Sequence, residues 1–214
     1  MTIGIGISTT PNRDILDTTI KEWKKYLPRN AVLIIENDHN YTGVAATKNR
    51  LLAKLDEFDH IFLADDDVMP LMYNWHEPYV NSKEPHLMYQ FKLPNKGSKD
   101  MQEVYRDDKI VAYTHTRGAL LYIKKYVLEV VGGFDTSYGR AMFEHPDWTN
   151  RIHNAGLTTY RAMDVPDSHE LLYCFDQDSQ IKSSISDKVR GLGMRNNYKL
   201  YQQSKKSREF KDYK

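Results

Sequence analysis

Three consecutive aspartates, Asp65, Asp66 and Asp67, are the strongest chemical signal in the sequence. They directly follow an apolar run, Ile61–Ala64, that is typical of a buried strand. Carboxylates this close repel one another unless a cation lies among them. In an extended segment Asp65 and Asp67 point the same way, so the two can share one Mg²⁺ or Mn²⁺, ions that prefer oxygen ligands. An acidic solvated turn or a helix cap is the alternative interpretation.

A second group of residues that can accept a proton begins at Glu144. His145 follows it, and an imidazole with a pKa near neutrality is chemically able to take a proton from a hydroxyl group. Asp147 is a further candidate base. The structural alternative is a helix with Pro146 at its first position, Asp147 complementing the helix dipole and Trp148 in the core. The residue types alone leave both interpretations open.

Alternating strands and helices are predicted to position the aspartates. Apolar runs and helical spacing predict strands at 2–8, 31–36 and 60–64, a helix at 14–26 with Asp14 as its cap, and a helix at 44–55. Strands that alternate with helices at this spacing are typical of βαβ units and a parallel sheet. Open sheets of this α/β class bind ligands at the carboxyl ends of their strands, where the three aspartates lie.

The pattern changes after Pro70. Shorter apolar runs predict strands at 86–91, 110–114, 119–123 and 158–162, a polar hairpin or loop at 93–107, and helices at 125–131 and 146–154. We therefore expect a smaller antiparallel portion beside the parallel sheet.

Composition indicates one globular domain. The chain has 214 residues, of which 40% are hydrophobic and 28% charged, and no apolar run reaches the roughly 18 residues of a membrane span. Cys174 is the only cysteine and cannot form an internal disulfide. The N-terminal residues lack the basic patch and long apolar stretch of a signal peptide, which predicts a cytoplasmic location.

Charge is distributed unevenly along this domain. Residues 181–214 carry ten Lys or Arg and three Asp or Glu, a net +7, and because the whole chain is +1 the residues before them carry −6. We assign 1–180 to the main domain and 181–214 to a basic helix or lid segment of the same domain. The basic segment indicates an anionic partner, such as a diphosphate, a nucleic acid or a lipid headgroup.

The order and spacing of several motifs resemble those of the nucleotide-sugar glycosyltransferases of the GT-A fold. A glycine-led segment, Gly43–Arg50, precedes the strand that ends in the Asp-x-Asp motif, and Arg117–Leu120, Gly132–Asp135 and Phe143–Arg151 follow later in the chain. The matched segments span residues 3–170. The resemblance implies a Rossmann-like, mostly parallel central sheet flanked by helices, with the small antiparallel portion on the acceptor side.

This resemblance also implies roles for individual residues. Those expected at the nucleotide-sugar donor are Thr9, Pro11, Arg13, Asp38, Lys48, Asp65, Asp66, Arg117 and Gly118. Those expected at a Mn²⁺ or Mg²⁺ ion are Asp65, Asp67 and His169, a histidine late in the chain. The general base is expected among Glu144, His145 and Asp147, and His145 stands where the family usually has an aspartate. Lys182, Lys188 or Arg190 of the basic segment is expected to meet the diphosphate.

The predicted function is transfer of a sugar from a nucleotide diphosphate donor, preferably a UDP-sugar, to a hydroxyl group by an inverting displacement. The acceptor stays open among a saccharide, a lipid-linked sugar, a protein side chain and a hydroxymethylated base in DNA, the last suggested by the basic segment. One alternative is a nucleotidyltransferase, which usually has a Gly-rich phosphate loop that residues 7–13 lack. The other is a non-catalytic binding domain stabilised by a metal ion.

Overall fold

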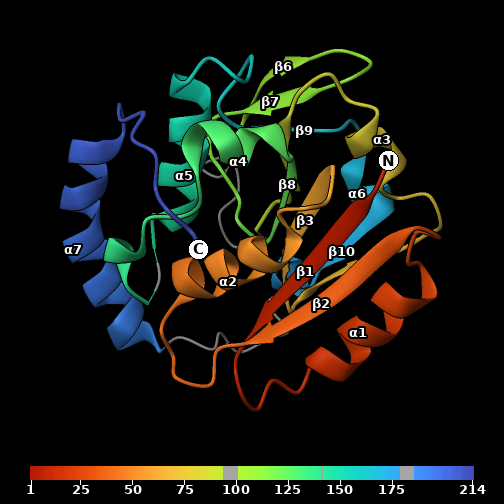
Figure 1. Ribbon diagram of the computed structural model, residues 1–214, viewed down its shortest axis with the longest axis horizontal. Coiled ribbons are helices and arrows are strands. Elements are labelled where there is room, and N and C mark those ends of the chain that lie inside the picture. The colour runs from red at the N-terminus through yellow and green to blue at the C-terminus, as the bar shows by residue number, and fades with distance from the viewer. Residues whose placement is uncertain (94–100, 141, 179–185) are drawn as a thin grey trace.

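A five-stranded sheet with the strand order β2-β1-β3-β8-β5 is the centre of the fold (Figure 1). The structure is a computed structural model that describes residues 1–93, 101–140, 142–178 and 186–214. The strands of the central sheet are β1 (Ile3–Thr9), β2 (Ala31–Asn37), β3 (His60–Asp65), β5 (His86–Met88) and β8 (Leu120–Lys124). β1 is parallel to β2 and β3, and β8 is antiparallel to β3 and β5. All strands of this sheet except β8 run in one direction, which confirms the predicted α/β class.

Helices cover both faces of this sheet (Figure 1). They are α1 (Leu16–Lys25) on one face and α2 (Val44–Leu55), α4 (Tyr126–Val131) and α5 (Glu144–Asn154) on the other. The α1 face buries Trp23 with the isoleucines of β1. The α2 face buries Leu51 and Leu55 together with Trp148 of α5. Two hydrophobic cores therefore hold the sheet in place between its helices.

The alternation of Ile and Gly in β1 has a packing reason. Ile3, Ile5 and Ile7 point into the core on the α1 face. On the α2 face a Cβ atom at Gly4 would lie 2.8 Å from Leu55 Cδ2, closer than van der Waals contact allows. The glycines let α2 approach β1 closely, which brings the start of α2 to the carboxyl end of the strand.

Short antiparallel strands complete the fold. β6 (Glu103–Arg106), β7 (Val111–Tyr113) and β9 (Met163–Asp164) form a small sheet, and β4 (Val68–Pro70) pairs with β10 (Leu172–Cys174). The predicted strand at 158–162 is wrong, because pairing with β7 begins only where Tyr113 N donates to Ala162 O and continues into β9. Within the predicted hairpin or loop at 93–107, residues 94–100 lie outside the described residues.

Two helix starts differ from their predictions. α5 begins at Glu144 rather than at Pro146, because Phe143 adopts the left-handed conformation, with φ of 75°, that ends the preceding turn. Pro146 is therefore the third residue of the helix. The N-cap position of α1 is Ile15, which makes no side-chain cap, so Asp14 does not have the predicted capping role.

The basic segment forms a surface helix, α7 (Asp187–Ser204), with no buried residue. Ser186 caps it by accepting a hydrogen bond from Val189 N. The remaining helices are short: α3 (Glu77–Val80), α6 (Ser168–Leu171) and the 3₁₀ turns η2 (Thr136–Tyr138) and η3 (Phe175–Asp178). In the described part of the chain, no helix has the length and apolar character needed to cross a bilayer.

Candidate active site

A cleft of about 200 Å³ lies where β1 and β3 end. The parallel register sets Ser8 of β1 beside Asp65 of β3, so the turns that follow both strands open at one edge of the sheet. The predicted donor and metal residues that line this cleft are Thr9, Arg13, Asp38, Asp65, Asp66 and Asp67. Residues far apart in the sequence therefore meet at the position expected from the order of strands and helices.

Asp67 is a carboxyl group in an unfavourable environment. Burial, and then the charges of Asp65, Asp176 and Asp66, raise the pKa of Asp67 to about 8. Burial and the charge of Asp65 also raise the pKa of Asp176. Ligand atoms of Asp67, Asp176 and Cys174 lie within 4.8 Å of one another. A divalent cation among these carboxylates would remove the repulsion, so the residues fit a hard metal ion.

The segment around β10 brings Asp176 to this cluster. β10 pairs with β4 so that Cys174 lies opposite Val68, and Phe175 N donates to Asp67 O at 3.0 Å. Burial and the charge of Asp67 raise the pKa of the Cys174 thiol well above its usual value, so its sulfur is a protonated and poor ligand for Mg²⁺ or Mn²⁺. Asp176 was missed in the sequence, where an acidic residue just after the apolar triplet at 172–174 was the available signal.

Asp66, the middle one of the three consecutive aspartates, is held by hydrogen bonds from other side chains of the protein. Arg13 donates to Asp66 from Nη2 at 2.7 Å and from Nε at 2.9 Å, and Thr9 Oγ1 donates to Asp66 at 2.6 Å. Asp66 is buried, so the ion pair with Arg13 lies largely out of solvent. These contacts join the turn after β1 to the end of β3. Asp66 thereby contributes to the shape of the cleft while Asp65 and Asp67 keep carboxylate oxygens for a ligand.

Lys48 connects Asp65 to Gly118, a residue of the predicted segment Arg117–Leu120. Its Nζ lies 3.0 Å from Asp65 Oδ1 and donates to Gly118 O at 2.8 Å, and its side chain is only 1% exposed. Ser8 Oγ donates to the same oxygen of Asp65. A Cβ atom at Gly118 would lie 2.6 Å from His145 Nδ1. Lys48 and Gly118 therefore link Asp65 to the start of α5.

Glu144 and His145 form a pair at that helix start. Glu144 is buried, and its Oε1 lies 3.2 Å from His145 Nδ1. Burial raises the pKa of Glu144, but the hydrogen bond and charge of His145, with a contribution from Lys48, outweigh it and leave the pKa lowered. An ionised Glu144 holds the proton on Nδ1 and leaves Nε2 free to accept one. The second oxygen, Oε2, is buried without a hydrogen-bond partner in the described part of the chain.

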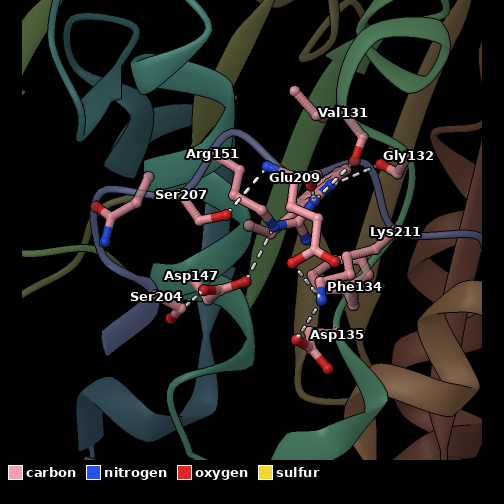
Figure 2. A network of polar contacts seen from close by, with 12 residues as sticks. Val131, Gly132, Phe134, Asp135, Asp147, Arg151, Ser204, Ser207, Glu209 and Lys211 are labelled. Atoms are coloured by element: carbon pink, nitrogen blue, oxygen red, sulfur yellow. Dashed lines mark hydrogen bonds and ion pairs between the residues drawn. The ribbon is translucent and has the colours of Figure 1, made fainter. Parts of the chain in front are cut away.

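Asp147 makes structural contacts within the protein, and the catalytic role expected for it stays a prediction. It is 1% exposed, and it accepts hydrogen bonds from Arg151 Nε at 3.0 Å, Tyr138 OH at 3.1 Å and Ser204 Oγ at 2.6 Å. Figure 2 shows Arg151 extending from this contact toward Val131, the last residue of α4, whose carbonyl oxygen accepts a hydrogen bond from it. Arg151 also donates to Gly133 O. With its oxygens used in this way, Asp147 anchors α7. None of Glu144, His145 and Asp147 is a lining residue of the cleft.

Asp38 shapes the loop at the opposite side of the cleft. Its two carboxylate oxygens accept hydrogen bonds from Thr42 N, Thr42 Oγ1 and Gly43 N. These bonds outweigh the effect of burial and lower the pKa of Asp38. The residue lines the cleft, as predicted for a donor-binding residue, and its hydrogen bonds also fix the start of α2.

His169 is the metal-ligand prediction that the geometry does not support. It lies on the short helix α6 with an exposed side chain, and the metal-competent group found among the described residues contains Asp176 in its place. The physical reason is the pairing of β10 with β4. This pairing brings Asp176, just after β10, close to Asp67, whereas His169 on α6 is not brought there. Pro11 lies in the turn after β1 without lining the cleft. Arg117 packs over the Phe91 ring and donates to Phe91 O.

Two arginines add positive charge to the cleft. Arg140 lies over the Tyr41 ring, 5.2 Å from its centroid, and was not predicted. Arg190, on the first turn of α7, is one of the basic residues expected to meet the diphosphate, and it lines the cleft. Lys182, another of them, lies outside the described residues. The charge of Arg190 partly offsets the raised pKa of Asp176. The cleft therefore combines acidic groups with arginines, a composition that suits a metal ion together with an anionic ligand.

Comparisons with known proteins define the fold. No protein-family model matches the sequence, and no curated protein matches it. The similar solved structures include the following three, each at 13% identity. The catalytic domain of Drosophila β1,4-galactosyltransferase 7 with xylobiose has a TM-score of 0.51, and the alignment covers 90% of this chain and 79% of that one. GalNAc-T7 with UDP, GalNAc and Mn²⁺ has a TM-score of 0.62 and coverages of 94% and 49%.

The third structure is the mannosyltransferase PcManGT from Pyrobaculum calidifontis in complex with GDP-Man and Mn²⁺. Its TM-score is 0.54, with 94% of this chain and 62% of that chain covered. The chain thus spans about half of GalNAc-T7 and less than two thirds of PcManGT. At this identity the similarity concerns the fold, and the chain has the GT-A fold of these glycosyltransferases.

Proposed function

We propose that the chain is a metal-dependent glycosyltransferase that moves a sugar from a nucleotide diphosphate donor to a hydroxyl group. The observation that carries this proposal is the acidic cluster of Asp65, Asp67 and Asp176 in the cleft at the ends of β1 and β3. Burial and like charges raise the pKa of Asp67 to about 8, and a divalent cation among these carboxylates would relieve that repulsion once it displaces the proton. Two of the similar structures contain Mn²⁺, one with UDP and one with GDP-Man, which supports a nucleotide-sugar donor.

The residues that would hold the metal ion are Asp65, Asp67 and Asp176. When bound, a divalent cation supplies positive charge that stabilises a departing diphosphate. Lys48 and Arg13 keep the neighbouring charges balanced, since each forms an ion pair with one aspartate of the triad. Arg140 and Arg190 supply further positive charge for diphosphate oxygens.

The proposed base is His145, positioned by Glu144. In the neutral form with a proton on Nδ1, His145 donates to Glu144 Oε1 and accepts the proton of the acceptor hydroxyl at Nε2. The hydroxyl oxygen then attacks the anomeric carbon as the bond to the diphosphate breaks, and the proton stays on His145. A base on the acceptor side accords with an inverting displacement. Gly118 packs against the imidazole ring and thereby limits its rotation.

A UDP-sugar is the preferred donor, and a saccharide is the preferred acceptor. The similar structures contain UDP with GalNAc, and xylobiose, which supports both choices. Nothing in these comparisons supports a DNA base as the acceptor. Mn²⁺ is the preferred ion because two of the similar structures contain it.

Calorimetry with UDP in the presence and absence of Mn²⁺ tests the proposal. We expect Mn²⁺-dependent binding that Asp67→Asn and Asp176→Asn each weaken by about 10- to 100-fold, whereas His169→Gln, a change on the exposed helix α6, leaves it intact. Release of UDP from a panel of UDP-sugars then tests turnover. Metal binding with no affinity for UDP or GDP would instead identify a metal-stabilised binding domain and reject the transferase.

A further inference from the structure

Helix α7 has one side bound to the protein and one side free. Figure 1 shows it at the edge of the molecule, beside α5. The bound side includes Asn197, which donates to Tyr138 O at 2.7 Å, and Ser204, which donates to Asp147. It also includes Tyr201, whose hydroxyl accepts from Asn150 and whose ring stacks on Phe143. These contacts fix which side of the helix faces solvent.

The free side carries a stripe of positive charge. Lys188, Arg195 and Lys199 are separated by seven and four residues, a spacing that aligns side chains along one side of a helix. All three are exposed, and within residues 186–214 and the other described ranges none of them forms an ion pair. Asp187 is the one acidic residue of this helix. Because the charges are not neutralised by the protein, they remain available to an anionic partner.

Apolar side chains lie among these charges. Leu192 follows Lys188 by four residues and precedes Arg195 by three, so it belongs to the same stripe and is 44% exposed. Met194 is 46% exposed, and Tyr198, which is 52% exposed, lies toward the bound side, where its ring packs against Phe143. A helix that serves only as a solvated surface gains nothing from exposing these side chains to water. Basic residues interleaved with exposed apolar residues are typical of helices that lie on a membrane surface.

We propose that the free side of α7 docks on an anionic lipid bilayer. The three cations would contact lipid phosphates, while Leu192, with Met194 at the margin of this side, would enter the boundary between headgroups and acyl chains. Lys188, Leu192, Arg195 and Lys199 lie within about 60° of one another around the helix, so these four side chains can reach one flat surface. The apolar side chains favour a bilayer over a nucleic acid, because phosphates of a nucleic acid are recognised without them.

The position of α7 connects this surface to the cleft. Arg190, on the first turn of the same helix, lines the cleft that holds the aspartates. A protein docked through α7 therefore has its cleft close to the membrane. The contact itself needs no nucleotide, metal ion or turnover, so vesicle binding and the transfer reaction can fail or succeed separately.

Cosedimentation of the full chain with lipid vesicles tests the proposal. We expect binding to vesicles of equal parts phosphatidylcholine and phosphatidylglycerol at low salt, and none to pure phosphatidylcholine. The triple variant Lys188→Gln/Arg195→Gln/Lys199→Gln should bind on the order of 100-fold more weakly. The matched control, Lys21→Gln/Lys24→Gln/Lys83→Gln, removes three exposed lysines from other elements and should bind as the wild type does. Equal losses in the two variants, or no binding to anionic vesicles, would overturn the proposal.

A second variant separates a bilayer from a nucleic acid. Leu192→Ser/Met194→Ser keeps every charge, and both side chains are exposed, so the fold should persist. We expect this variant to lose vesicle binding by about 10-fold or more while its binding to a duplex DNA fragment is unchanged. If the wild type binds duplex DNA more tightly than anionic vesicles and the serine variant binds vesicles normally, the surface is a nucleic-acid site and the membrane proposal is wrong.

Discussion

Lys48 Nζ lies 3.0 Å from Asp65 Oδ1 in a position where the lysine side chain is almost fully buried. A buried ammonium group loses its hydration and needs an anion or carbonyl groups nearby. Lys48 finds both, because it also donates to Gly118 O. The buried ammonium group of Lys48 thus neutralises the charge of Asp65, the first of the three consecutive aspartates.

Replacement of Lys48 by Met should destabilise the metal-free protein by about 2 kcal/mol. The value is smaller than for a fully buried ion pair, because Asp65 is 36% exposed and water screens its charge. Urea denaturation in a chelator measures the loss, and added Mn²⁺ should recover part of it. Lys54→Met is the control, since Lys54 pairs with Glu36 at the surface and should matter by less than about 0.5 kcal/mol. Equal losses would contradict the special position of Lys48.

Replacement of Asp67 by Asn should change how stability depends on pH. The pKa of Asp67 is about 8 in the folded protein and about 4 in an unfolded chain, so the folded state holds the proton more tightly. The stabilising effect of that proton is complete below pH 4 and is lost as the pH rises to about 8. In a chelator, wild type should therefore lose stability relative to Asp67→Asn over this range.

Denaturation of both proteins at several pH values between 4 and 8 measures this difference. Its size should be on the order of a few kcal/mol at the upper end. Saturating Mn²⁺ should reverse the order, because the ion binds only the carboxylate and stabilises the wild type. A difference between the two proteins that is constant with pH would mean that Asp67 is already ionised in the metal-free fold.

Replacement of Gly118 by Ala should lower turnover without unfolding the protein. The added Cβ would lie 2.6 Å from His145 Nδ1, so the imidazole ring must move away from Glu144. We expect kcat to fall by about 10- to 100-fold with KM for the donor little changed, because a small displacement of a base is costly. Gly191→Ala is the control: a Cβ there meets open space, and it should stabilise α7 by about 0.5–1 kcal/mol and leave kcat unchanged.

Replacement of Arg151 by Met should destabilise the protein by about 3–5 kcal/mol. The guanidinium group is fully buried, pairs with Asp147 and donates to Val131 O and Gly133 O, so its loss leaves a buried carboxylate and carbonyl groups without partners (Figure 2). Thermal unfolding measures the change. Limited proteolysis should cut near residue 205 earlier than in the wild type, because the segment after α7 packs on this arginine. An unchanged cleavage pattern would show that the segment is held by other contacts.

The sequence predicted the βαβ half of the fold because its elements are long and periodic. β3 and α2 contain enough apolar residues for the sequence to predict their type and their bounds. The position of the three aspartates at the end of β3 could then be predicted as well. β4, β9 and β10 are two or three residues long, and only their tertiary pairing partners determine them. The predicted strand at 158–162 failed for this reason.

The difference between His169 and Asp176 has the same origin. Both residues come late in the chain, and both are chemically able to bind a metal ion. The pairing of β10 with β4 decides which of them reaches Asp67, and this pairing leaves no signal in the periodicity. Likewise, the sequence makes Asp147 a candidate base, and only the packing of α7, through the hydrogen bond from Ser204 Oγ, shows that this carboxylate anchors the helix.

The antiparallel direction of β8 makes the chain between Phe91 and Arg117 leave and return at one rim of the sheet, because β5 ends and β8 begins beside the end of β3. Arg117 closes this excursion by packing over the Phe91 ring and donating to Phe91 O at 3.2 Å. The described part of this excursion is tied to the rest of the fold, because Ile110 and Ala112 lie in the core of the α1 face and β7 pairs with β9.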